Sequence, residues 1–261
     1  MRNKNIASLG YRLEKSADVG RVATLLKVCG LERPADEQGG QTTYLMATTA
    51  AGGVAASVGW TAMEDNLAVI HSLAVAPSSR GIGIGASLLA SAMLHLREER
   101  GVRAIFLGGN GIAGYFKRLG FLELEPAEIP AIIRRHPTFE KGVSRPMVRR
   151  YGVERHGLDR CAFCLIHNTT SNATLPEGSV FWFRQSGAVL EAQYRGGPVV
   201  RGHLLGAMDG ETLRFIWQSC TQKSELIRGD GEIIIELLDD GRRELREKIG
   251  RDPGELLLRE L

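Results

Sequence analysis

The hydrophobic periodicity of this 261-residue chain changes near residue 150, and no other feature constrains the fold as strongly. Before that point, helical repeats alternate with short apolar runs, which predicts a layered α+β domain. After it, helical periodicity is almost absent and β-rich runs are separated by glycine turns, which predicts an all-β antiparallel sandwich or barrel. The expected helices are 18–30, 86–100 and 111–118; the expected strands are 42–48, 54–62, 67–75, 104–107, 161–170, 179–185, 188–194, 199–206, 212–219 and 231–238.

We place the domain boundary after a connector at 137–150 that is rich in arginine, so that residues 1–150 form one domain and residues 151–261 the other. Charge follows the same division. The first part holds 19 Lys and Arg against 13 Asp and Glu, and the second holds 14 against 17. Each part is long enough to bury a core of its own.

Composition excludes several classes of protein and partner. With 43% hydrophobic and 24% charged residues, the chain has the composition of a globular protein. No apolar run approaches the ~20 residues of a membrane span, and the N-terminus lacks the apolar stretch of a signal peptide. We therefore expect a cytoplasmic protein with no membrane partner. The densest basic cluster, Arg145, Arg149 and Arg150, has no interleaved aromatic residues, so we expect no nucleic-acid partner either.

A glycine-rich segment joins the predicted strand 67–75 to the helix that follows. Its sequence, Arg80-Gly81-Ile82-Gly83-Ile84-Gly85, opens the helix, where backbone N–H groups and the helix dipole favour an anion. The spacing differs from the dinucleotide-binding fingerprint, and the Gly-Lys-Ser/Thr of a P-loop is absent. The segment is either an anion site of another kind or a plain helix start.

Two motifs resemble those of the GNAT N-acetyltransferase superfamily. Arg80-x-x-Gly83-x-Gly85, after a strand ending in Val-x-Pro, resembles the loop that binds the pyrophosphate of acetyl-CoA, and NGIAGYFKRLGF at 110–121 resembles the following helix. The resemblance covers about residues 10–150 and implies a GNAT acyl-CoA N-acyltransferase fold with acetyl-CoA as co-substrate. Within the superfamily, the stretch IHSLAVAPSSRGIGIG is similar to N-acetylglutamate synthase-like enzymes and to acetyltransferases found with arsenic-resistance genes.

The resemblance also implies the residues that bind coenzyme A. Where the fourth strand separates from the fifth, the backbone of Leu73, Ala74 and Val75 should pair with the pantetheine arm, although these are also ordinary core positions. The pyrophosphate should lie on backbone N–H groups between positions 80 and 86. Further along, Asn110 stands near the helix-capping asparagine of the family, and Phe116 stands where the family often has a tyrosine. The pyrophosphate set is Arg80, Gly81, Ile82, Gly83, Ile84, Gly85 and Ala86.

Acetyl transfer to an amine needs a base for the amine and an acid for the departing thiolate. His71 occupies the strand position where many family members have a glutamate. It is therefore the candidate base, directly or through a water, unless it is a structural strand histidine. Glu64 in the preceding turn is a second candidate. Tyr115, next to Phe116 and about 100° around the helix, is the candidate acid.

The second half carries no acetyltransferase motif. Cys161-x-x-Cys164 has no partners at zinc spacing, and positions i and i+3 of a strand face opposite ways, so we expect no metal. The stretch QYRGGPVVRGHLLGAMDGETLRF resembles a small bacterial β-rich family often labelled N-acetylglutamate synthase-like, which implies an avidin- or lipocalin-like barrel. Such a barrel either binds a small ligand at its mouth or serves as a structural module that forms a homodimer.

Together these features predict an N-acetyltransferase that acts on a small-molecule amine, such as an amino acid or amino-acid-like compound. Its acceptor pocket should be built from residues 31–41 and 124–145. Acetylation of a protein N-terminus or of a xenobiotic amine remains an alternative within the enzymes. A protein that senses acyl-CoA or a metabolite with little turnover is the alternative outside them, because Phe116 replaces the usual tyrosine.

Overall fold

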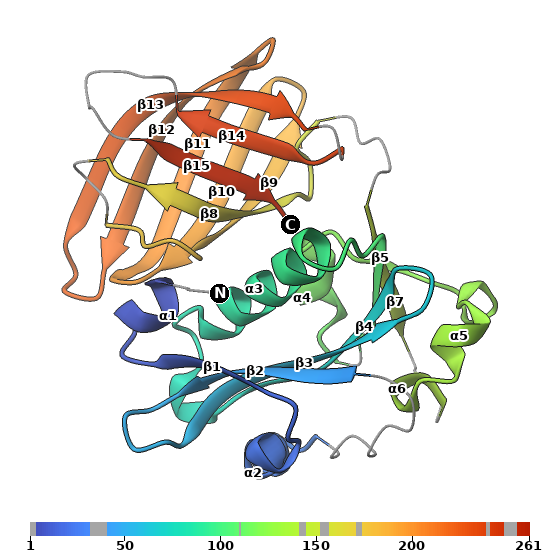
Figure 1. The fold of residues 1–261 in the computed structure, drawn as a ribbon. Helices are drawn as coiled ribbons and strands as arrows, with labels where there is room; N and C mark the ends of the chain where they lie inside the picture. Colours follow the sequence, from blue (N-terminus) through green and yellow to red (C-terminus); the bar gives the residue numbers. More distant parts are fainter. Residues whose placement is uncertain are drawn as a thin grey trace. The chain divides into compact units, whose positions relative to one another are not determined.

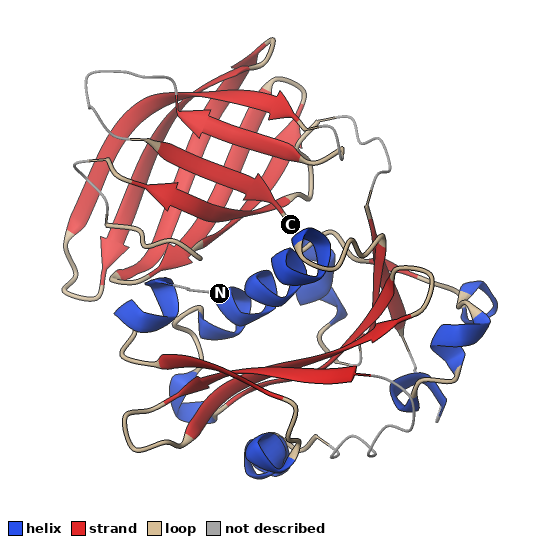
Figure 2. Cartoon of the chain, in the orientation of Figure 1, coloured by secondary structure: helices blue, strands red, loops and turns tan. Residues whose placement is uncertain are grey.

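The computed structural model describes residues 4–31, 41–109, 111–140, 145–151, 157–170, 174–238, 241–247 and 255–261. Contacts between residues divide the chain into two units. The first comprises Met1–Arg2 and Gly10–Tyr151, and the second comprises Asn3–Leu9 and Gly152–Leu261. Figure 2 shows the difference in their make-up: helices and strands alternate in the first unit, whereas strands dominate the second.

The first unit is built on a seven-stranded sheet in the order β1-β2-β3-β4-β5-β7-β6. All neighbouring strands are antiparallel except β4 and β5. The strands predicted before residue 110 are confirmed, and Asp65 and Asn66 supply the positive φ angles of the tight β3–β4 turn. The strands are β1 (Arg12–Ser16), β2 (Gln41–Thr48), β3 (Val54–Met63), β4 (Leu67–Val75), β5 (Ala104–Gly108), β6 (Leu122–Glu123) and β7 (Pro146–Arg150).

Helices cover both faces of this sheet. Figure 1 shows α3 along one face and α2 and α6 on the other. Apolar residues at helical spacing on α2 pack against Tyr44 and Met46 of β2, and residues of the α5–α6 segment form a second cluster with Leu67 and Val69 of β4. The helices are α2 (Gly20–Val28), α3 (Ile84–Glu98), α4 (Ala113–Arg118), α5 (Ala131–Arg134) and α6 (Pro137–Glu140), with 3₁₀ turns η1 (Pro77–Ser79) and η2 (Pro126–Glu128).

The prediction of a connector at 137–150 is wrong. This segment contains α6 and β7, and β7 lies inside the sheet between β5 and β6. Its arginines suggested a solvated linker, but Arg149 is buried and its guanidinium lies 5.7 Å from the centre of the Tyr151 ring. Contact with an aromatic ring stabilises a buried guanidinium, so an arginine can lie in a central strand. The residue types of this segment do not reveal that contact.

The second unit is a closed antiparallel barrel in the order β10-β11-β12-β13-β14-β15-β8-β9, with the short helix α1 (Lys4–Ser8) assigned to the same unit. Six of its strands match the predicted runs, and the hairpin glycines Gly187 and Gly210 have positive φ as expected. The strands are β8 (Ala162–Asn168), β9 (Val180–Ser186), β10 (Val189–Gly196), β11 (Val199–Asp209), β12 (Thr212–Thr221), β13 (Leu226–Leu237), β14 (Arg243–Glu247) and β15 (Leu256–Glu260).

Strands β14 and β15 escaped prediction because a buried ion pair occupies positions where an apolar residue would mark a strand. Arg243 Nε lies 2.9 Å from Glu260 Oε2, and Arg243 Nη2 lies 3.0 Å from both Glu260 Oε1 and Cys161 Sγ. Burial opposes the charge of Arg243, but the hydrogen bonds and charge of Glu260 outweigh it and raise the pKa of the guanidinium. The pair therefore joins the two strands in its charged form.

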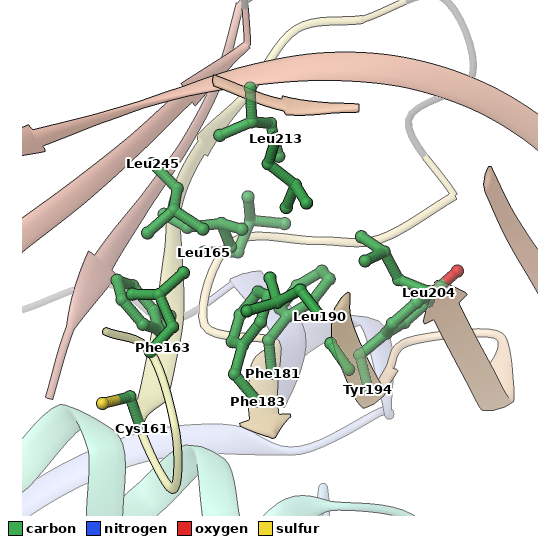
Figure 3. Packing of buried hydrophobic residues seen from close by; sticks show 14 of the residues in the cluster. Cys161, Phe163, Leu165, Phe181, Phe183, Leu190, Tyr194, Leu204, Leu213 and Leu245 are labelled. Carbon is green, nitrogen blue, oxygen red and sulfur yellow. The ribbon is translucent and has the colours of Figure 1, made fainter. Parts of the chain in front are cut away.

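Glycines of the barrel signature are explained by packing. A Cβ on Gly202 would overlap the ring of Tyr194, and a Cβ on Gly196 would overlap the side chain of Ser179. Tyr194 in turn places its hydroxyl 2.9 Å from Ser219 Oγ. Figure 3 shows Phe183, Leu190 and other apolar side chains gathered in the barrel interior. The motif therefore reports how closely the strands of this barrel pack.

Replacing Gly202 with Ala should lower the free energy of unfolding of the barrel by about 1–3 kcal/mol, because Tyr194 must leave its place and its bond to Ser219. Urea denaturation followed by β-sheet circular dichroism measures this. His203→Ala is the control, since His203 is an exposed neighbour of Gly202 on β11. Equal stability of the Gly202→Ala and His203→Ala proteins would contradict the packing argument.

We expect the two units to fold separately. A fragment ending at Tyr151 keeps the bond from Tyr151 N–H to the Arg103 carbonyl, 2.9 Å, and should give a mixed α/β circular dichroism spectrum. A fragment starting at Gly152 should give a β-type spectrum with a cooperative thermal transition. A helical spectrum or a non-cooperative melt of the second fragment would contradict independent folding.

Candidate active site

Strand β4 leaves its neighbour halfway along its length. It pairs with β5 only through Leu67, Ala68 and Val69, although it continues to Val75. Ala76 N–H donates to the Ala55 carbonyl of β3 at 2.8 Å, so by alternation Leu73 and Val75 turn their backbone groups away from β3. We call this stretch, Ile70–Val75, the released edge of β4. On this side the released edge has no partner strand, although β4 lies in the middle of the sheet.

A β-bulge accounts for the released edge. Between the pairs Gly59↔His71 and Ser57↔Ala74, β4 has one residue more than β3. Ser72 takes up the extra length with a left-handed φ of 52°, and Ser57 Oγ donates to its carbonyl at 3.0 Å. A bulge bends its strand and increases the twist, which turns β4 away from β5 just beyond His71.

The glycine segment forms the start of α3 directly after β4. Gly81 and Gly83 have φ angles of 82° and 88°, which disfavour a side chain, and Gly83 is the N-cap. A Cβ on Gly85 would lie 2.9 Å from Val75 Cγ2, so this glycine lets the helix approach β4. These glycines therefore have backbone and packing reasons of their own, besides the anion site expected from the sequence.

The N-terminus of α3 offers hydrogen-bond donors. The first intrahelical bond from the N-cap runs from Ser87 N–H to the Gly83 carbonyl at 3.0 Å, so the N–H groups of Ile84, Gly85 and Ala86 precede it. No acidic residue occupies the first turn to compete for them. These donors and the helix dipole suit an anionic group such as a pyrophosphate. Arg80 folds back, with Nε donating to the Val75 carbonyl at 3.0 Å.

His71 lies immediately before the bulge, on the sheet face that carries α2. Its Nε2 is 3.2 Å from Thr61 Oγ1 and its Nδ1 is 3.0 Å from Ser72 Oγ. The ring lies over Gly59, where a Cβ would come within 2.7 Å of His71 Cε1, and meets the Tyr44 ring edge-on at 5.9 Å. The predicted base is therefore held in one place by all three strands around it.

A second histidine, His136, completes this cluster, and the sequence analysis missed it. Its ring centre is 5.6 Å from that of His71, and its Nε2 is 3.1 Å from the same Thr61 Oγ1. Thr138 N–H donates to His136 Nδ1 at 3.1 Å, so the neutral ring carries its proton on Nε2 and donates it to Thr61.

The residues of the 110–121 motif contribute less than expected. Phe116 is buried and packs edge-on against Phe121, with ring centres 5.8 Å apart. Burial raises the pKa of Tyr115, so its phenol stays protonated at neutral pH. In the described part of the chain, the ring contacts of Tyr115 are with Phe116 and Arg118, not with His71. Asn110 lies outside the described residues.

Other predicted features can be placed as well. Glu64 is exposed in the β3–β4 turn, and Cys161 and Cys164 are both buried in the barrel. Among the described residues, no group of three His, Cys, Asp or Glu side chains could hold a metal ion. None of the helices within the described ranges is long and apolar enough to cross a membrane. Of the expected acceptor loops, 32–40 and 141–144 lie outside the described residues.

Two protein families match the chain, one in each unit. Residues 28–121 match the Acetyltransferase (GNAT) family, and residues 156–258 match the family described as Avidin-like protein. No curated protein matches the chain.

Several solved structures are similar to about half of the chain. A GNAT-family acetyltransferase from Staphylococcus aureus has 15% identity and a TM-score of 0.41, covering 53% of this chain and 99% of that one. An acetyltransferase from Streptococcus agalactiae has 16% identity and a TM-score of 0.44, covering 54% and 98%. N-acetylglutamate synthase from Neisseria gonorrhoeae, in complex with coenzyme A and N-acetyl-glutamate, has 18% identity and a TM-score of 0.43, covering 53% and 35%.

Gly83→Asp and Gly83→Asn form a matched pair that tests the anion site at the start of α3. Asp and Asn tolerate positive φ about equally, so the two proteins differ mainly by one charge. At ~5 Å and an effective dielectric of ~20, repulsion from a phosphate costs about 3 kcal/mol, or about a hundredfold in affinity. Calorimetry with coenzyme A should show this loss for Asp relative to Asn. Equal affinities of the Asp and Asn proteins for coenzyme A would show that the pyrophosphate does not bind at the N-terminus of α3.

Proposed function

Because residues 28–121 belong to the GNAT acetyltransferase family and are joined to an avidin-like domain, the chain is an acyl-CoA-dependent N-acyltransferase, and we propose that it acetylates the amine of a small molecule. The observation that supports this most directly is the arrangement around β4. The released edge of β4, the His71 ring and the N-terminus of α3 all lie within residues 70–86.

In this proposal, acetyl-CoA binds mainly to backbone groups. The amides of the pantetheine arm pair with Leu73 and Val75 as a short added strand, in place of the missing partner β5. The pyrophosphate accepts hydrogen bonds from the first N–H groups of α3. Arg80 Nε donates to the Val75 carbonyl, where the pantetheine arm would join the pyrophosphate. The side chain of Arg80 therefore has to move when the coenzyme binds.

The chemistry follows from this placement. His71 takes a proton from the acceptor ammonium group at Nδ1, the atom beside the bulge, and the free amine attacks the thioester carbonyl. A C–N bond forms and the C–S bond breaks as the tetrahedral intermediate collapses. The thiolate of coenzyme A then takes a proton from Tyr115 or from water, and the second proton that the nitrogen loses on becoming an amide replaces the one that this donor gave up. Burial raises the pKa of Tyr115, which keeps the phenol protonated at neutral pH but makes it a weaker acid than an ordinary tyrosine.

The acceptor is proposed to be an amino acid or an amino-acid-like compound. The support comes from the resemblance of residues 70–85 to N-acetylglutamate synthase-like enzymes. The barrel is proposed to add no catalytic residue, since its signature glycines serve to pack strands together. A protein N-terminus or a xenobiotic amine is the competing acceptor class.

One observation favours a second function. Phe116 occupies the position where the family often has a tyrosine, and it is buried against Phe121. A domain without an efficient acid would bind acetyl-CoA and turn it over slowly, as a sensor does. Release of coenzyme A from acetyl-CoA, measured with a panel of amino acids, amine xenobiotics and N-terminal peptides, separates the two. Tight binding without turnover on any acceptor would favour the sensor.

His71→Ala should lower turnover by roughly 10²–10⁴-fold, because the amine loses the base that accepts its proton. Coenzyme A affinity should stay unchanged, since the coenzyme binds to the backbone beyond residue 72 in this proposal. Steady-state kinetics and calorimetry on the same preparation measure the two quantities. Glu64→Ala is the control and should retain wild-type turnover, given its exposed position. A His71→Ala protein as active as wild type would make His71 a structural residue.

A further inference from the structure

We propose that the side chain of Arg80 makes the coenzyme site selective for pantetheine that carries a pyrophosphate. In the free protein this side chain occupies the last carbonyl of the released edge of β4, and a pyrophosphate at α3 attracts it away. The inference rests on the proposed function, since it concerns the same binding site. Neither family match assigns a role to this side chain.

The Val75 carbonyl already has two hydrogen-bond donors. Arg80 Nε donates to it at 3.0 Å, and Cys29 Sγ donates to it at 3.4 Å. A backbone carbonyl oxygen has two lone pairs, so both are in use. An amide N–H of the pantetheine arm can therefore donate to this oxygen only after one of the two donors has left.

The chain around Arg80 holds its guanidinium at this place. The preceding turn η1 is anchored by Ser79, which is buried and whose Oγ lies 3.0 Å from the hydroxyl of Tyr11. Arg80 follows directly, and besides its bond to β4 its Nη2 lies 3.9 Å from Sγ of Cys29, the C-cap of α2. The guanidinium therefore lies at the point where the pantetheine arm would join the pyrophosphate.

Of the two donors, Arg80 is the one that an anion displaces. A thiol is a weak donor, whereas a guanidinium is always charged and pairs with phosphate through two parallel N–H groups. Arg80 stands three residues before Gly83, the N-cap of α3, so it lies on the same loop as the proposed pyrophosphate site. It is also exposed, so its bond to the carbonyl is weakened by water. A pyrophosphate therefore offers Arg80 a stronger partner than Val75 does.

This exchange couples the two parts of coenzyme A. An anion at the start of α3 releases the Val75 carbonyl, and the pantetheine arm then binds to it. Pantetheine without a phosphate has to displace a charged donor and offers that donor no new partner. Because coupling between two sites is reciprocal, pantetheine also favours binding of the anion. The site thus discriminates against free pantetheine and its thioesters, which have the same reactive sulfur as coenzyme A.

Calorimetry on the full chain with pantetheine, inorganic pyrophosphate and coenzyme A tests the exchange. In wild type, saturating pyrophosphate should raise the affinity for pantetheine about threefold to tenfold, because a competing charged donor leaves the carbonyl. Arg80→Ala should bind pantetheine tighter than wild type by a similar factor without pyrophosphate, and pyrophosphate should then add nothing. The same variant should bind coenzyme A about tenfold more weakly, because a charge-assisted bond to phosphate is lost.

Two further variants serve as controls. Arg100→Ala removes the same charge from an exposed position beyond the C-terminus of α3, and it should match wild type with all three ligands. Arg80→Lys keeps a charged donor and should retain coupling of the same sign. A merely structural role of Arg80 predicts weaker binding of pantetheine and coenzyme A alike, so the opposite changes in Arg80→Ala separate the two roles.

An Arg80→Ala protein that binds pantetheine no tighter than wild type would overturn the inference. So would a wild-type protein in which pyrophosphate leaves the affinity for pantetheine unchanged. None of these measurements needs an acceptor amine. If they follow the expected order and no amine is acetylated, the proposed function is wrong and the role of Arg80 still holds. If an amine is acetylated and Arg80→Ala shows no gain for pantetheine, the proposed function holds and the inference is wrong.

Discussion

The single extra residue in β4 is the constraint on which the site depends. Without Ser72 in its left-handed conformation, β4 would pair with β3 in uniform register and could continue alongside β5. The bulge stops that pairing, places His71 at the last position before the bend and directs the remaining backbone groups of β4 to a side with no partner strand. The cost is a strained serine, and the Ser57 hydrogen bond to its carbonyl offsets part of it.

The polar cluster around His71 depends on a second compromise. Two histidines and a threonine lie between the cluster under α2 and the cluster under the α5–α6 segment, where apolar side chains would pack without any hydrogen-bonding requirement. Burying such groups is tolerable only when each finds a partner. Here Thr61 lies within hydrogen-bond distance of both histidines, and the N–H of Thr138 in α6 donates to His136. A network of this kind fixes orientation better than a lone histidine could.

Much of this architecture could be predicted from the sequence, and the reasons differ from part to part. The predictions of a GNAT domain and an avidin-like domain are confirmed. Both could be made because glycines in the motifs have local structural causes: positive φ at Gly81 and Gly83, and close packing at Gly202. What failed had long-range causes. His136 reaches Thr61 across 75 positions of sequence, and the buried Arg243 of β14 reaches Glu260 of β15 across 17 positions, which periodicity does not reveal.

The order of strands in the barrel has a kinetic consequence. Strand β15 closes the barrel by pairing with β8, the first strand of the set, so residues 256–260 must find residues 163–168 across nearly the whole length of the domain. Contacts of such separation form late and slowly. During synthesis the sheet of the first unit has all its strands once residue 150 has emerged, whereas seven strands of the barrel would wait with two edges exposed until the eighth arrives. The acidic and basic side chains of β14, which left this strand hard to recognise, also make one of the two waiting edges a poor template for another chain.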